Sequence, residues 1–243
     1  VGIGAPVGTG LGIPGEEAEG VLDALSFLKQ YNIRGNVKIK KNILVIGGGN
    51  AAVDAARTAV RLGAENVTII YRRERDQMPA YQEEVEEAIV EGVKLVDLTQ
   101  PVEVLTGADG KVSGIKCLKM KLGDFDNQGR RRPLKAGEDY FEIKGDQIIT
   151  AIGQKLDKSV LEEVGELDYY ENGFIRANAS TGQSSVEWLF TGGDSSFGPS
   201  SVVKAIGAGE IAAVGIDYYL TGADNAFWRE EKKVETSFDP DAD

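Results

Sequence analysis

The sequence predicts an α/β protein, because short apolar strand-like segments alternate with helix-like segments along most of its 243 residues. Residues 41–71 show a buried strand, a glycine-rich turn, a helix of small residues and a second strand, which form one βαβ unit. Residues 102–122 instead show two β-rich runs around Asp109-Gly110, a dipeptide typical of hairpin turns. We therefore expect strand–helix alternation interrupted by hairpins.

The helices and strands can be placed in order along the chain. Helical spacing of Val21, Leu22, Leu25 and Leu28 predicts a helix over 19–31. Further helices are expected at 50–62, where Gly63 would end the helix, at 81–91, and from about Ser201 to 220. The helix at 81–91 should bury three residues, namely Val85, Ala88 and Ile89. Strands are expected at 41–46, 67–71, 148–152 and 188–191, the last of them buried.

The remaining segments are predicted to be turns and loops. Asn172-Gly173 is a second hairpin signal, and residues 129–133 form a polar, basic loop. The glycine- and proline-rich stretch 1–15 starts as a short apolar segment, and the acidic tail from Thr221 onward should be poorly ordered.

The composition excludes several classes of function. A net charge of −12 without a long basic tract argues against nucleic-acid binding. One cysteine, Cys117, and no histidine exclude a disulfide framework, a His-liganded metal and a Ser–His–Asp triad. No apolar run reaches the roughly 20 residues that span a bilayer, and no export signal is visible. We therefore expect a cytoplasmic protein without a metal site in these residues.

A dinucleotide-binding fingerprint lies inside the βαβ unit. In Gly47-Gly48-Gly49, Gly47 permits the sharp turn after the strand, and Gly49 lets a pyrophosphate approach the backbone. Ala52 would allow the helix to pack closely on the strand. The backbone amides of Asn50 and Ala51 then offer an anion site at the helix N-terminus. The alternative is a tight strand–helix turn without a ligand.

Two arginines follow the second strand of the unit. An NAD site usually carries Asp or Glu at this place to hold the ribose 2′-hydroxyl, whereas here Arg72 and Arg73 stand there. A guanidinium matches a 2′-phosphate, so the pair favours NADPH over NADH. The alternative is a solvated basic face. Arg75 could assist, although Glu74 and Asp76 could equally take up its charge.

Five motifs follow one another in the order found in a known family. They are GGGNAAVD at 47–54, YRRERDQMPA at 71–80, GRRRP at 129–133, AIGQ at 151–154 and FTGGD at 190–194. Together they resemble the small (beta) subunit of NADPH-dependent glutamate synthase and its relatives. Those relatives include the reductase portion of dihydropyrimidine dehydrogenase and many iron–sulfur flavoproteins. The resemblance covers the chain from Val1 to about Leu220.

The resemblance implies a flavoprotein fold with two dinucleotide-binding domains, in which a Rossmann-like NADPH domain is inserted into the FAD domain. On this pattern residues 1–34 are a partial FAD-domain segment, beginning with a closing strand at Val1–Ala5. Residues 35–149 are the NADPH domain, 150–222 the remainder of the FAD domain and 223–243 a polar tail. The family's first flavin fingerprint and its cysteine clusters are expected upstream of Val1.

The resemblance also implies further site residues. The segment Ala151, Ile152 and Gly153 resembles the crossover back into the FAD domain, and Gly193-Asp194 resembles the flavin signature whose carboxylate takes a ribityl hydroxyl. Ser201 and Val202 would begin a helix pointing at the flavin pyrimidine ring. Asp54 is implied as a nicotinamide-facing carboxylate, or else is an ordinary surface carboxylate. No catalytic residue is assigned.

The implied activity is hydride transfer from NADPH to FAD, with electrons passed on to iron–sulfur clusters and a partner subunit. The partner would be a larger catalytic subunit or an electron-acceptor protein. We expect these residues alone to bind NADPH, to bind FAD weakly or not at all, and to be inactive. Two alternatives remain: an NADH-linked electron-transfer flavoprotein subunit, and a non-catalytic binding module that docks through Arg130–Arg132. A thioredoxin-reductase relative is disfavoured, because the chain has no Cys-x-x-Cys.

Overall fold

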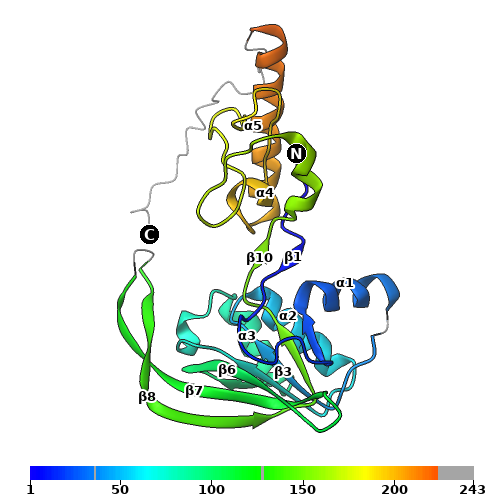
Figure 1. Cartoon of the computed structure of the whole chain (residues 1–243), viewed down its shortest axis with the longest axis vertical. Coiled ribbons are helices and arrows are strands. Elements are labelled where there is room, and N and C mark those ends of the chain that lie inside the picture. Colours follow the sequence, from blue (N-terminus) through cyan, green and yellow to red (C-terminus); the bar gives the residue numbers. More distant parts are fainter. Residues whose placement is uncertain (36, 127–128, 224–243) are drawn as a thin grey trace, which may run out of the picture. The chain divides into compact units, whose positions relative to one another are not determined.

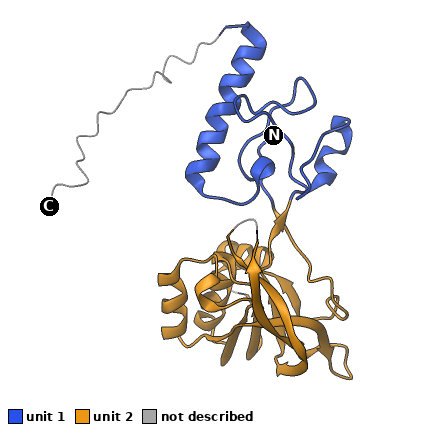
Figure 2. Cartoon of the chain, turned by 90° about the vertical axis from the view of Figure 1, so that its left-hand side faces the viewer, with its two compact units in different colours: residues 1–5, 156–243 blue, residues 6–155 orange. Residues whose placement is uncertain are grey.

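The computed structural model describes residues 1–35, 37–126 and 129–223, which form two compact units. Unit 2 comprises Pro6–Lys155, and unit 1 comprises Val1–Ala5 together with the chain from Leu156 onward (Figure 2). The sequence predicted boundaries after residues 34 and 149, whereas the units divide after 5 and 155. The reason is that residues 21–23 pair with the sheet of unit 2, which draws the preceding loop into that unit.

Unit 2 is built on a five-stranded parallel sheet, in the order β2-β9-β3-β4-β5. The expected βαβ unit is present as β3, α2 and β4, and the expected strand near 148 is β9. The bounds are β2 Val21–Asp23, β3 Asn42–Ile46, α2 Asn50–Arg61, β4 Asn66–Ile70, β5 Lys94–Val96 and β9 Gln147–Thr150.

The helix predicted over 19–31 starts later than its spacing suggested. Val21 and Leu22 belong to strand β2, where they pair with Ile148 and Ile149 of β9. Helix α1 covers Ala24–Arg34, because the side chain of Asp23 caps it by accepting hydrogen bonds from the amides of residues 25 and 26 at 3.3 and 2.8 Å.

Helices α2 and α3 (Gln82–Val90) enclose one half of the core of unit 2. α2 buries Ala52, Ala55, Ala56 and Ala59 completely, which brings the helix close to the sheet. α3 buries Val85 and Ala88 as expected, but Ile89 is 38% exposed and the prediction for it is wrong. Between β4 and α3 lies a short 3₁₀ helix, η1 (Arg75–Gln77).

A three-stranded antiparallel sheet completes unit 2. It consists of β6 (Thr99–Thr106), β7 (Val112–Phe125) and β8 (Arg131–Lys144), and β7 and β8 form a long curved ribbon (Figure 1). The hairpin predicted at Asp109-Gly110 joins β6 to β7. Arg131–Pro133, predicted as loop, instead begin β8, with Pro133 paired to Leu122. Two short strands, β1 (Val7–Gly8) and β10 (Gln154–Lys155), pair with each other where the chain enters and leaves the unit.

Unit 1 has little regular structure apart from η2 (Lys158–Val164), α4 (Asp194–Phe197) and the long helix α5 (Val202–Thr221). α5 confirms the helix predicted from Ser201, and Tyr169 pairs with Ile175 across the expected Asn172-Gly173 turn. The strand predicted at 188–191 is reduced to a single bridge from Phe190 to Gln183, with Trp188 62% exposed.

Two other expectations concern the ends of the chain. Val1–Ala5 form no regular strand, although the carbonyl oxygen of Val1 accepts a hydrogen bond from the amide of Gly192 at 3.3 Å. The tail beyond residue 223 lies outside the described residues. Within the described ranges, no helix has the length and apolar character needed to cross a membrane.

Candidate functional site

The glycine-rich turn lies between the carboxyl end of β3 and the start of α2. Gly47 has φ +149°, and a Cβ there would lie 2.3 Å from the carbonyl oxygen of Ala151. Its amide donates to the carbonyl oxygen of Ile70 at 3.1 Å, and the amide of Ala151 donates to the carbonyl oxygen of Ile46 at 2.8 Å. The turn is thus enclosed by neighbouring strand ends, and only glycine fits at its first position.

The ring of Tyr71 packs against the glycine-rich turn, a contact that the sequence did not predict. A Cβ on Gly48 would lie 2.4 Å from the ring of Tyr71, whose hydroxyl donates to the carbonyl oxygen of Gln77 at 2.8 Å. The carbonyl oxygen of Gly48 in turn accepts from the amide of Ala80 at 3.1 Å. The only signal in the sequence was the position of the tyrosine, directly before the two arginines.

Gly49, the third glycine of the turn, borders open space. A Cβ on Gly49 would find no heavy atom within 4 Å, and Gly49 is the N-cap of α2 without a side-chain cap. Within the described part of the chain, no acceptor is recorded for the amides of Asn50 and Ala51. The side chain of Asn50 accepts from the amide of Tyr81 at 3.0 Å. Free amides at a helix N-terminus beside open space form a site suited to an anion.

The structure separates the two arginines that the sequence treated as a pair. Arg72 is exposed, yet neighbouring protein atoms partly desolvate its guanidinium, and this desolvation together with the nearby cations Arg73 and Arg130 lowers its pKa. Arg73 is buried at 6% exposure, and its Nε donates to the carbonyl oxygen of Arg131 at 2.8 Å. A second nitrogen of Arg73 lies 3.5 Å from the carboxylate of Asp126. Arg72 alone of the two is therefore placed to meet a ligand.

The other residues predicted for the site in unit 2 take different positions. Ala151 packs against Gly47, and Gly153, with φ +133°, accepts from the amide of Thr9 at 3.0 Å. Ile152 between them is 42% exposed. Asp54 is exposed on α2, one turn beyond Asn50 and on the same face of the helix. Its role towards the nicotinamide stays a prediction.

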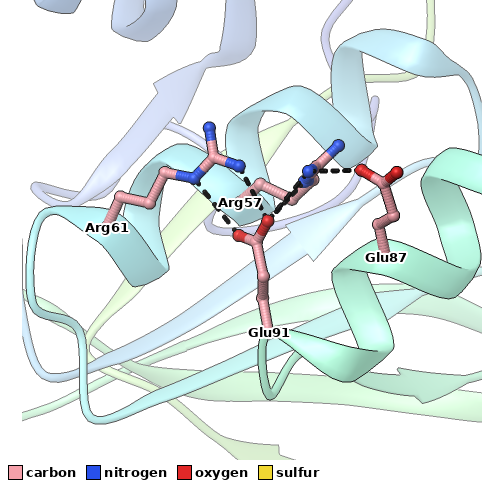
Figure 3. Close-up of polar contacts among 4 residues, drawn as sticks. All are labelled: Arg57, Arg61, Glu87 and Glu91. Carbon is pink, nitrogen blue, oxygen red and sulfur yellow. Dashed lines mark hydrogen bonds and ion pairs between the residues drawn. The ribbon is translucent and has the colours of Figure 1, made fainter.

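An ion-pair cluster connects α2 to the end of α3 (Figure 3). A terminal nitrogen of Arg57 lies 2.6 Å from Glu87 and 2.8 Å from Glu91, and Arg61 lies 2.7 Å from the same Glu91. The hydrogen bonds from Arg61 and Arg57 lower the pKa of Glu91. At the opposite end of α3, the bond from Tyr81 to Asn50 joins the same two helices, so both ends of α3 are held to α2.

In unit 1, all the predicted flavin residues line one cavity of about 410 Å³. Gly193 and Asp194 lie at the start of α4, and the carboxylate of Asp194 accepts from the amide of Ser200 at 3.2 Å. Ser201 caps α5 by accepting from the amide of residue 204 at 3.3 Å, and Val202 begins the helix. Small residues of α5 form the rest of the wall together with Val1, Gly2 and Gly4.

A parallel sheet whose strand β3 turns through three glycines into α2 defines unit 2 as a dinucleotide-binding domain. Residues 2–209 match the pyridine nucleotide-disulphide oxidoreductase family, and the chain belongs to this family. It is thus a member of a family of NAD(P)-dependent flavin oxidoreductases, as the resemblance predicted. Among the described residues, no cluster of His, Cys, Asp or Glu is able to hold a metal ion.

Curated relatives share between a third and two fifths of their aligned residues with this chain. The NADP(+)-dependent formate dehydrogenase subunit beta of Moorella thermoacetica is 39% identical over 213 residues, covering 86% of this chain and 30% of the relative. The glutamate synthase [NADPH] small chain of Escherichia coli K12 is 35% identical over 224 residues, covering 86% and 47%. The chain therefore spans less than half the length of these two relatives.

Solved structures confirm the predicted fold class. FprA from Mycobacterium tuberculosis, in a complex with NADPH, superposes with a TM-score of 0.73 at 19% identity, over 91% of this chain and 63% of FprA. Thioredoxin reductase from T. acidophilum superposes with a TM-score of 0.68 at 21% identity, over 91% and 64%. The chain has the fold of flavoproteins with two dinucleotide-binding domains, and it spans under two thirds of these neighbours.

Proposed function

We propose that unit 2 binds NADPH and that unit 1 contributes to the binding of FAD, so that the chain takes part in hydride transfer from NADPH to the flavin. The observation that carries the proposal is the open space at Gly49 beside the amides of Asn50 and Ala51, with exposed Arg72 after the next strand. NADPH supplies the hydride and FAD accepts it; the protein's part is binding and orientation.

Each part of the coenzyme would meet a different group of unit 2. The pyrophosphate lies against the N-terminus of α2, where the amides and the helix dipole stabilise its negative charge. Arg72 pairs with the 2′-phosphate, since a guanidinium forms two charge-assisted hydrogen bonds with such a group. Asp54, one helical turn beyond Asn50 on the same face of α2, would face the nicotinamide.

For FAD, the cavity of unit 1 is lined by polar residues such as Asp194 and Ser201 and by small or apolar residues. The amide end of α5 at Ser201 and Val202 would stabilise negative charge on the flavin ring, and Asp194 would accept from a ribityl hydroxyl. Relatives are named as beta subunits or small chains, which supports a larger catalytic or electron-acceptor subunit as the partner. Iron–sulfur clusters would belong to parts of such an enzyme outside these residues.

The coenzyme preference can be tested by titrating NADPH and NADH against the wild-type chain and an Arg72→Ala variant. We expect the wild type to prefer NADPH by about tenfold or more, since one charge-assisted hydrogen bond contributes about 1.5–3 kcal/mol. The variant should lose most of this preference with little change in its affinity for NADH. Equal binding of both coenzymes by the wild type would refute the assignment.

A further inference from the structure

The tip of the β7–β8 ribbon is held against the end of β4 by a buried arginine. Arg73 Nε donates to the carbonyl oxygen of Arg131 at 2.8 Å, and its terminal nitrogen lies 3.5 Å from Asp126. Asp126 in turn accepts from the amide of Arg130 at 2.9 Å. These contacts join residue 73 to residues more than fifty positions further along the chain.

The side chain of Arg73 is not available to a ligand while it makes these two contacts. Its side chain is only 7% exposed, so turning it towards a ligand would leave the carbonyl oxygen of Arg131 and the carboxylate of Asp126 without a buried charged donor. Arg72 next to it is exposed. Consequently, the segment that Arg73 contacts is held next to the neighbour of Arg72, the residue assigned to the 2′-phosphate.

The segment that Arg73 contacts carries positive charge. Arg130 lies between Asp126 and Arg131, the two residues that Arg73 holds, and its own side chain is partly exposed. Its charge is felt at Arg72, where it lowers the pKa of the guanidinium. Arg73 and Arg130 lie 3.5 and 3.8 Å from the carboxylate of Asp126, so two guanidinium groups share one carboxylate beside Arg72. A surplus of cations at one place is costly unless an anion binds there.

We propose that Arg130 is a second ligand of the coenzyme's 2′-phosphate beside Arg72, and that buried Arg73 is the positioning residue that holds Arg130 there. The inference rests on the proposed binding of NADPH and extends its specificity site to the GRRRP motif. In that motif Arg131–Pro133 begin β8, and Arg130 directly precedes the strand. The 2′-phosphate would then bind between the end of β4 and the start of β8, with a cation from each.

The test compares adenosine 2′,5′-bisphosphate with 5′-AMP, two probes that differ only in the 2′-phosphate. Calorimetry on the complete 243-residue chain gives the ratio of their dissociation constants, which is the selectivity for the 2′-phosphate. Arg130→Ala should lower this ratio by about tenfold or more, and Arg130→Lys should restore part of it. Arg132→Ala, which removes the same charge two residues further along, inside β8, should leave the ratio unchanged.

The positioning role of Arg73 is tested by a measurement that would not change if Arg73 served only to stabilise the fold. Arg73→Met should lower the selectivity ratio by a similar factor, measured well below the melting temperature of each variant. In an Arg130→Ala background it should have no further effect on the ratio, because the group it positions is gone. If Arg73→Met fails to fold, the Arg130 and Arg132 variants decide the question alone.

Two negative results are distinguishable. If Arg72→Ala abolishes the selectivity while Arg130→Ala keeps it, the role of Arg130 is refuted and the proposed NADPH site stands. If the wild type binds both probes equally, the proposed 2′-phosphate site itself is refuted.

Discussion

The most direct test of the dinucleotide site contrasts two alanine substitutions in one turn. In Gly49→Ala the new methyl meets no atom within 4 Å, and the backbone is already in an extended conformation that alanine adopts. Alanine is a poorer N-cap than glycine by up to about 1 kcal/mol, which is offset by about 0.4–1 kcal/mol from the lower entropy of the unfolded chain. The stability should therefore stay within about 1 kcal/mol of wild type.

The methyl does, however, enter the space through which a pyrophosphate would reach the amides of Asn50 and Ala51. Losing one or more charge-assisted hydrogen bonds costs about 1.5–3 kcal/mol, which corresponds to a 10- to 150-fold weaker affinity for NADPH. The melting temperature without ligand should change by less than about 4 °C, while the rise produced by added NADPH should shrink or vanish.

Gly47→Ala is the matched control, and it should show the opposite behaviour. Its Cβ would lie 2.3 Å from a backbone oxygen at φ +149°, so overpacking and backbone strain together cost roughly 2–6 kcal/mol. Differential scanning fluorimetry should show a fall of about 4 °C or more without any ligand. Wild-type affinity for NADPH in Gly49→Ala would refute the reasoning, because the coenzyme could then not approach the helix at that glycine.

Two further predictions concern other parts of unit 2. Glu91→Gln should lower the free energy of unfolding by about 1–2 kcal/mol at pH 7, whereas Glu65→Gln at an exposed pair should change it by much less. The folded-state pKa of Glu91 lies below its ordinary value of 4.5. The difference in unfolding free energy between wild type and Glu91→Gln should therefore be complete above pH 4.5 and disappear as the pH falls through the lowered pKa. A difference in urea melts that does not change with pH would contradict this. Burial raises the pKa of the Cys117 thiol to about 12, so a thiol reagent at pH 8 should label it only at the rate of unfolding, and rapid labelling of the native protein would show that the thiol is accessible.

Local signals were enough for the centre of unit 2. Buried strands next to small-residue helices, with glycines at the turns, predict β3, α2 and β4, because each feature depends on residues close in sequence. The resemblance, rather than local physics, assigned Gly193, Asp194, Ser201 and Val202 to a flavin site, and that assignment stays a prediction. These residues do line one cavity.

Distant partners explain where the predictions went wrong. Val21 and Leu22 have a helical spacing, but they join β2 because their pairing partners lie in β9, more than 120 residues away. Trp188 was expected in a buried strand, but only Leu189–Thr191 of that segment are buried, while Trp188 is 62% exposed. Apolar pattern alone does not tell which surface a side chain will meet.

By itself, the sequence determined the class of protein and the glycine turn to which we assign the coenzyme, since a glycine turn at a strand end needs only its immediate neighbours. Only the tertiary structure decided which of two adjacent arginines faces outward. Arg73 is buried because Asp126 and the carbonyl oxygen of Arg131 arrive from a distant hairpin and pair with its guanidinium, whereas Arg72 is exposed. A contact between segments so far apart in the chain depends on how the sheets fold together, which no local pattern records.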